Sequence, residues 1–171
     1  MSMSTGGSGW LSASSGLVLT GAVAAPLAAS GGPFSAVELF AACHVYDLSA
    51  FGLGLASNGG GADGQAFTFP SGTVAAGTFL WVSSAADPAV FEDWFGFPPD
   101  YAGVGGLALT GNDAVELYRN NEVADVIGQE TYNGTDPAWS FADGWVHRKA
   151  GTAPSADAYL SADWTVSQNS L

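Results

Sequence analysis

Cysteine and histidine residues that could bind a zinc ion are few in this chain and are poorly spaced for that purpose. The sequence contains one cysteine, Cys43, and two histidines, His44 and His147. Zinc sites are built mainly from Cys and His side chains at close spacing. Adjacent residues of a strand point to opposite faces, so Cys43 and His44 could not reach one ion from a strand. We therefore expect no structural zinc site, and we expect Cys43 to be a small buried thiol.

Hydrolytic chemistry has little support in the sequence. A serine hydrolase needs a nucleophile, a histidine and an acid brought together, and the chain contains no G-x-S-x-G nucleophile turn. Of the two histidines, His147 is the better candidate for a general base. A glycosidase needs two carboxylates that flank a sugar, and sixteen acidic residues give no way to single out such a pair. The chain is therefore predicted not to be an enzyme; the alternative is a small hydrolase that uses carboxylates or His147.

Oxygen ligands are plentiful by comparison. The glycine-rich stretch 57–64 contains Asn58 and Asp63, lacks the lysine of a phosphate-binding loop, and is expected to form a long turn between strands. Other acids in expected loops are Asp113, Asp125, Asp136 and Asp143. Calcium accepts such oxygen ligands in flexible geometry. No cofactor is expected to be required, but calcium binding is a prediction, with Asp63 and Asp113 as the first candidate ligands.

The charge balance disfavours two classes of partner. Three basic residues (Arg119, Arg148 and Lys149) stand against sixteen acidic ones, which gives a formal net charge of −13. Nucleic acids and anionic lipid surfaces are both bound through Lys and Arg, so neither is expected as a partner. Hydrophobic residues make up 47% of the chain, but the apolar stretch 17–29 is interrupted by glycine and proline. It is also too short for a membrane-spanning helix, and no membrane insertion is expected.

Short apolar stretches, each closed by Gly, Pro, Asn or Asp, predict an all-β fold. Strands are expected near 17–24, 36–41, 50–56, 66–69, 78–83, 107–109, 114–119, 122–127, 144–148 and 163–166. Residues 1–16 are rich in Gly and Ser and are expected to be a flexible tail. Residues 17–171 are expected to form one β-sandwich domain.

Three details of this strand pattern follow from side-chain alternation. In the Val-Glu-Leu segment 37–39, the Glu38 carboxylate is expected to face water while its neighbours face the core, and segment 114–118 repeats the pattern. Asn120-Asn121 is expected to form a two-residue hairpin turn, since Asn tolerates positive φ. Trp81 lies in an expected central strand and is therefore predicted to be buried.

Residues 87–96 depart from the β pattern and predict a short helix. Asp87 could cap its N-terminus, Pro88 could be the first helical residue, and Gly96 could end it. Helical spacing places Val90, Phe91, Trp94 and Phe95 on one face. We expect this face to be core and the helix to close one end of the sandwich. The alternative is that these aromatic residues form a platform for a ligand.

Several strand motifs occur in a characteristic order. Val37-Glu-Leu-Phe40 is followed by Asp47-Leu-Ser-Ala-Phe-Gly-Leu53, then by the Phe-Thr-Phe-Pro-Ser-Gly-Thr segment within 67–82, and then by the hairpin 111–128. In this order and spacing they resemble the lamin-tail domain family. The segments 58–61, 95–98 and 142–148 are closest to a subgroup on secreted marine bacterial proteins. The resemblance extends over residues 17–167, and it departs from the family at Ala41-Ala42-Cys43, where Asn-Pro-Thr is common.

The resemblance implies an immunoglobulin-like β-sandwich without catalytic residues, located extracellularly or at the cell surface. Such a domain would be a binding or structural module that contacts a protein partner, a second copy of itself or a polysaccharide. An intracellular, lamin-like scaffold is a further alternative, which the scarcity of basic residues for DNA contacts disfavours. Asn133-Gly134-Thr135 is an N-glycosylation sequon that would matter only if a eukaryote secretes the protein.

If the loop acids bind calcium, millimolar calcium should raise the melting temperature more than magnesium does at equal ionic strength. The reason is that an ion bound only by the folded state stabilises that state. Thermal unfolding followed by circular dichroism measures the two shifts. Equal shifts would rule out specific calcium binding.

Overall fold

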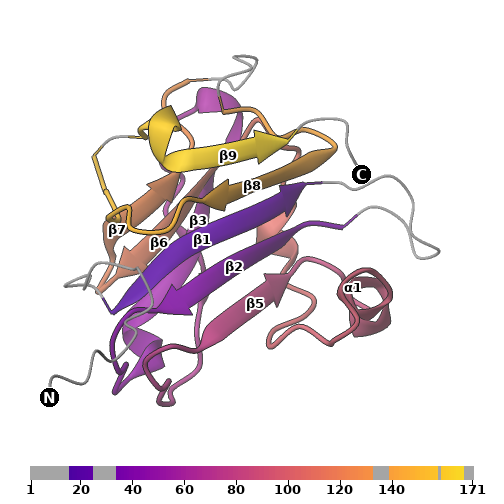
Figure 1. Cartoon of the computed structure of the whole chain (residues 1–171), viewed down its shortest axis with the longest axis vertical. Coiled ribbons are helices and arrows are strands. Elements are labelled where there is room, and N and C mark those ends of the chain that lie inside the picture. Colours follow the sequence, from indigo (N-terminus) through magenta and orange to yellow (C-terminus); the bar gives the residue numbers. More distant parts are fainter. Residues whose placement is uncertain (1–15, 25–33, 133–138, 158, 168–171) are drawn as a thin grey trace, which may run out of the picture.

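The computed structural model describes residues 16–24, 34–132, 139–157 and 159–167. Within these residues, nine strands form two antiparallel sheets that pack face to face (Figure 1). The five-stranded sheet has the order β5 (Phe79–Ser83), β2 (Ala36–Ala41), β1 (Leu17–Ala24), β8 (Gly144–Arg148) and β9 (Trp164–Ser167). The four-stranded sheet has the order β4 (Gln65–Thr68), β3 (Phe51–Ala56), β6 (Ala114–Arg119) and β7 (Glu122–Ile127). The all-β sandwich expected from the sequence is confirmed.

Alternation along the strands fills the space between the two sheets. Leu17 and Leu19 on β1 face Leu117 and Ile127 of the opposite sheet within one apolar cluster, and each of these four side chains is fully buried. Apart from the register shifts in β1, β4 and β7, the intervening residues point outward, as the period of two requires. Asn120 and Asn121 join β6 to β7 with φ values of 53° and 66°, which confirms the expected hairpin turn.

One expected strand is absent. Residues 107–109 were predicted to be a strand, but the chain there forms a 3-10 turn, Gly105–Leu107, followed by an irregular segment. The Ser35 hydroxyl donates to the carbonyl of Leu107 and accepts from the amide of Leu109 at 2.9 Å. The Ser35 side chain, which lies just before β2, thus satisfies main-chain groups that would pair with a neighbouring strand if 107–109 were a strand. Leu107 and Leu109 are buried nonetheless, which explains the apolar pattern.

The expected helix is present as α1 (Pro88–Phe95), but its place differs from the prediction. Asp87 caps it by accepting from the Ala89 amide at 3.0 Å, and Gly96 ends it with a φ of 77°. The helix does not close one end of the sandwich. It lies beside β5, outside the space between the sheets (Figure 1). In this position Phe91 of α1 packs with Phe34 in a second apolar cluster.

Trp81 also differs from its prediction. Strand β5 is an edge of the five-stranded sheet, and its Leu80 and Val82 take the inward positions. Trp81 therefore points outward, is half-buried, and packs its ring 5.5 Å from that of Phe91 on α1. The sequence could show the alternation of β5, but it could not show which face of the strand met the core. Within the described part of the chain, no helix has the length and apolar character needed to cross a membrane.

A buried ion pair joins the two sheets. Arg148 on β8 donates from Nη2 to both carboxylate oxygens of Asp125 on β7, each at 2.7 Å, and both side chains are almost completely buried. Asp125 was counted among the loop acids although it lies within the expected strand 122–127; it is a residue of β7, and its side chain points between the sheets. Burial raises the pKa of the Asp125 carboxyl, and the Arg148 guanidinium and two backbone amides oppose that rise.

The remaining hydrogen-bonding capacity of the pair is used on the main chain. Among the described residues, strand β8 pairs with β1 over Gly21–Ala24, and this pairing does not extend to Leu19. Arg148 Nε donates to the Leu19 carbonyl at 2.7 Å, and Asp125 accepts from the Leu19 amide at 2.9 Å. The guanidinium also lies 4.2 Å from the centroid of the Trp164 ring on β9. One ion pair therefore links β1, β7, β8 and β9.

Replacing Arg148 by methionine should destabilise the fold by about 3–5 kcal/mol, because it leaves the Asp125 carboxylate buried without its counter-charge. The double variant Arg148→Met, Asp125→Leu should be more stable than Arg148→Met alone. Urea denaturation measures both free energies of unfolding.

The matched control is Arg119→Met, an exposed arginine at the end of β6. Its effect should stay within about 0.5 kcal/mol, as for ordinary surface substitutions. A loss below about 1 kcal/mol for Arg148→Met would contradict the role assigned to the pair.

Candidate functional site

The outer face of the five-stranded sheet contains a hollow of about 330 Å³. We call it the tryptophan groove. Its lining is almost entirely apolar, with one carboxylate and one imidazole as the ionisable groups. Strands β1, β2, β5 and β8 and helix α1 contribute the lining residues, which are Gly21, Ala22, Val23, Glu38, Trp81, Trp94, Phe95, Trp145, Val146 and His147.

Strand register brings these residues together. Glu38 on β2 is paired with Trp81 on β5 and with Gly21 on β1, and Gly21 is paired in turn with His147 on β8. This row crosses four strands on one face of the sheet. Three strand spacings separate β5 from β8, so the groove extends roughly 14 Å across the strands.

Aromatic rings form both walls of the groove. On the β5 side, the Phe95 ring of α1 lies 4.9 Å from the Trp81 ring, and Trp94 lies beside them. On the far side stands Trp145 of β8, which points outward because Val146 takes the inward position. The Trp94 Nε1–H is buried and has no hydrogen-bond partner among the described residues. A buried indole N–H ordinarily has an acceptor, so this donor has unused capacity.

Glu38 is the acidic group of the groove. It was expected to face water; its side chain does point outward, but only 12% of it is exposed, because the aromatic walls cover it. Desolvation raises the pKa of Glu38 to about 7, and a hydrogen bond with Thr20 opposes the rise. His147 Nε2 lies 3.8 Å from Glu38 Oε2, beyond hydrogen-bond distance. The carboxylate therefore retains capacity to accept a hydrogen bond.

Gly21 keeps the floor of the groove open. The register of β1 on β2 shifts between Leu19 and Gly21, which places Gly21 between Glu38 and His147. A Cβ at this position would lie 3.1 Å from the Val146 carbonyl and 3.4 Å from Glu38 Oε2. Any larger side chain would occupy the space between the two ionisable groups.

Glu116 is a second glutamate in the same sequence pattern, but the glycine that it faces is covered by the chain. Glu116 on β6 occupies the same place in the repeated Val-Glu-Leu pattern and faces Gly54 of β3. A Cβ at Gly54 would overlap the Gly64 carbonyl, so the chain itself covers this region. Glu116 is fully buried and accepts from the Tyr118 hydroxyl at 2.7 Å. Desolvation raises its pKa to about 7, and Glu130 adds to the rise.

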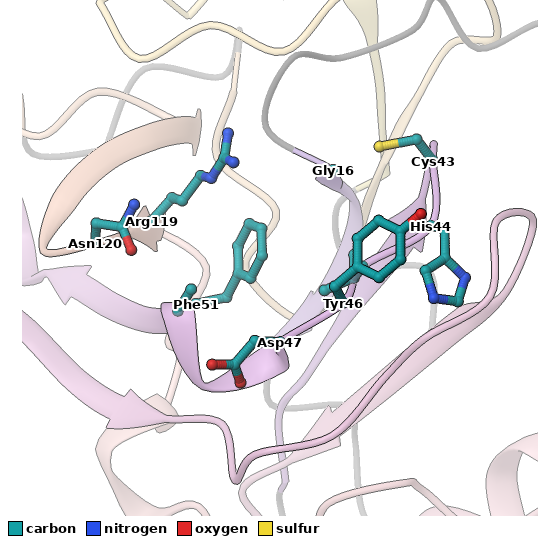
Figure 2. Close-up of a pocket in the computed structure, with 10 residues that line it drawn as sticks. Gly16, Cys43, His44, Tyr46, Asp47, Phe51, Arg119 and Asn120 are labelled. Atoms are coloured by element: carbon teal, nitrogen blue, oxygen red, sulfur yellow. The ribbon is translucent and has the colours of Figure 1, made fainter.

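The cysteine and the first histidine lie at a different hollow, of about 230 Å³, which Figure 2 shows. Cys43 is exposed there, so the prediction of a buried thiol is wrong. Its segment follows β2 as a surface turn, where side-chain alternation no longer holds. His44 packs against Tyr46, their ring centroids 4.5 Å apart, and Arg119 lies over the Phe51 ring. These polar groups do not converge on one point.

The calcium candidates are not brought together into an evident site. Asp113 is buried, and its carboxylate accepts from the Asn58 amide and from the Thr110 amide and hydroxyl. Asp63 is exposed, and its charge acts on Glu116. Among the residues that the structure describes, no group of three or more His, Cys, Asp or Glu is arranged to hold a metal ion. Calcium binding stays a prediction; Asn133 and Asp136 lie outside the described residues, as does the Gly/Ser-rich tail apart from Gly16.

Comparison of the chain with models of known protein families, with curated proteins and with solved structures gives no significant match. The resemblance to lamin-tail domains therefore stays a prediction, and the candidate site depends on the geometry of this chain alone.

Sequence reasoning named His147, and it offered the α1 aromatics as an alternative ligand platform. It missed Glu38 and Trp145 as groove residues. Their positions in the strands could have indicated this, because each residue alternates with apolar neighbours that point inward and must therefore point outward. The sequence did not contain the strand order that places β2 and β8 within one groove.

The free energy of unfolding should depend on pH through Glu38. Its pKa is 4.5 when exposed and about 7 in the fold, so the folded state is penalised above pH 7 and relieved as the pH falls toward 4.5. Glu38→Gln should therefore be more stable than the parent at about pH 8, by at most about 3 kcal/mol, with the difference shrinking toward pH 4.5. Urea denaturation across this range measures the effect.

Glu122→Gln is the control, because Glu122 is exposed at the start of β7. It should follow the parent across the range. A pH-independent difference between Glu38→Gln and the parent would show that Glu38 does not titrate as assigned.

Proposed function

We propose that this chain is a non-catalytic module that binds a glycan chain in the tryptophan groove. The observation that carries the proposal is the pair of indole walls on either side of a shielded carboxylate. Binding sites for small ligands are commonly concave and apolar, with a few polar groups that fix orientation. The groove has both properties.

The chemistry of a sugar ring matches these walls. A pyranose has apolar C–H faces and a polar edge of hydroxyl groups. Trp81 and Trp145 offer large flat apolar surfaces for the faces. Glu38 can accept from a hydroxyl, and His147, whose side chain is 48% exposed, can donate or accept at the groove's mouth. The groove's length across four strands suits several linked sugar units better than one.

The lining favours binding over hydrolysis. A glycosidase needs two carboxyl groups that flank the scissile bond, whether it retains or inverts configuration. Among the described residues that line the groove, Glu38 is the sole carboxylate. A hydrolase of the serine or cysteine type that used His147 would need a hydroxyl or thiol nucleophile beside it, and no Ser, Thr or Cys is among the described residues that line the groove.

A concave site also favours a glycan over a protein partner. Stable protein interfaces bury broad areas, of about 800 Å² on each partner, and a narrow hollow is a small part of such an area. The module would act outside the cell or at the cell surface, where polysaccharides are available, in keeping with the lamin-tail resemblance. A protein partner or self-association stays as an alternative for the remaining surface.

Trp145→Ala should weaken binding of oligosaccharides at least about tenfold, because a tryptophan that contacts a ligand usually contributes a large share of the binding energy. Isothermal titration calorimetry against a panel of soluble oligosaccharides measures the dissociation constants. Tyr46→Ala, an exposed aromatic at the other hollow, should bind like the parent.

Four results would count against the proposal. One is that no oligosaccharide binds, and another is that Trp145→Ala binds as the parent does. The third is release of reducing ends from the panel, abolished by Glu38→Gln or His147→Ala, which would favour the hydrolase. Sedimentation of the free chain as a dimer dispersed by Trp145→Ala would assign the groove to self-association.

A further inference from the structure

The charges around the tryptophan groove are strongly one-sided. The ionisable lining groups are Glu38 and His147, and α1 adds Glu92 and Asp93 next to Trp94 without any basic residue. The basic groups of the described chain lie elsewhere. Arg148 points to the other side of its sheet and is neutralised by Asp125, Arg119 is on the four-stranded sheet, and Lys149 donates to the Ala162 carbonyl.

From this arrangement we infer that the groove selects glycans whose sugar units carry free, protonated amino groups. The inference rests on the proposed function and names the ligand class of the same site. Polymers of unacetylated hexosamine are the chemical class that fits. Uronic acid and sulfated glycans are the classes that the groove should reject.

Glu38 is the group that would recognise the ammonium. Its side chain is 88% shielded, and its Oε2 lies on the open floor above Gly21. A shielded carboxylate gains more from a cationic donor than from a hydroxyl, because the opposite charge adds a Coulombic attraction that is less screened in a partly buried site than in open water. The 3.8 Å gap to His147 shows that no donor from the imidazole occupies this oxygen.

The aromatic walls act in the same direction. The faces of indole rings carry negative electrostatic potential, so they attract cations as well as apolar C–H groups. A protonated hexosamine presents both kinds of group on one ring. The formal net charge of −13 adds a long-range attraction for a cationic chain and a repulsion for an anionic one.

The test compares four sets of oligomers of equal length: glucosamine, N-acetylglucosamine, glucose and a uronic acid. Calorimetry should give the glucosamine oligomer a dissociation constant on the order of tenfold lower than that of the N-acetylated one, because the ammonium adds an attraction between opposite charges that the amide lacks. The uronic acid oligomer should not bind. Glu38→Gln should reduce the preference to about twofold, while Trp145→Ala should weaken all binding.

A charge-matched control distinguishes selection in the groove from a general attraction between a cationic glycan and an acidic protein. Glu122→Gln removes the same charge from an exposed site on the other sheet and should keep the full preference. If Glu122→Gln lowers the preference as much as Glu38→Gln does, the selection is not made in the groove and the inference fails. Circular dichroism checks that each variant is folded.

The remaining outcomes separate the two proposals. Equal or tighter binding of the N-acetylated or glucose oligomers by the parent would overturn the inference and leave the glycan-binding proposal standing. Binding of none of the oligomers would overturn both. If Glu38→Gln does not fold, salt titration of the parent decides: the preference should fall with added salt if charge produces it, and a salt-independent preference would refute the inference.

Discussion

The ion pair between Arg148 and Asp125 is the constraint on which the rest of the fold depends. Two charged side chains are removed from water, each lies within hydrogen-bond distance of its counter-charge, and the main chain of Leu19 satisfies capacity that remains. This arrangement fixes the distance between β7 and β8 and replaces the missing ladder contacts at the start of β1. Because Arg148 of β8 points inward, the residues that alternate with it and with Val146 point outward, and these are Trp145 and His147.

The Val-Glu-Leu sequence occurs twice in this sandwich, and its two glutamates lie in different environments. Glu38 and Glu116 both follow a buried valine, both face a glycine on the adjacent strand, and burial raises the pKa of both to about 7. The chain around Gly64 closes over Gly54, and Glu116 is sealed within the protein. Over Gly21 the space is left open, and the same chemical pattern becomes part of a groove.

Local features were predictable from sequence, and distant pairings were not. The bounds of β1, β2, β6, β7 and β8 follow from alternation and turn residues, and the α1 cap follows from Asp87, Pro88 and Gly96. The face on which Trp81 lies, the partner of Arg148 and the shielding of Glu38 depend on strand order. That order brings β1 beside β8, more than a hundred residues later in the chain, and no periodicity within a strand encodes such a neighbour.

Because α1 lies outside the space between the sheets, its residues are under different packing constraints from the residues of the inter-sheet core. Residues that contribute to the inter-sheet core are bound by packing, and a change there lowers the stability of the whole domain. The helix holds its place through ring contacts on the outer cluster, and its exposed residues are free of that demand. The wall that α1 contributes to the groove can therefore change between related sequences without repacking of the inter-sheet core, so the shape of this surface is separable from the stability of the scaffold.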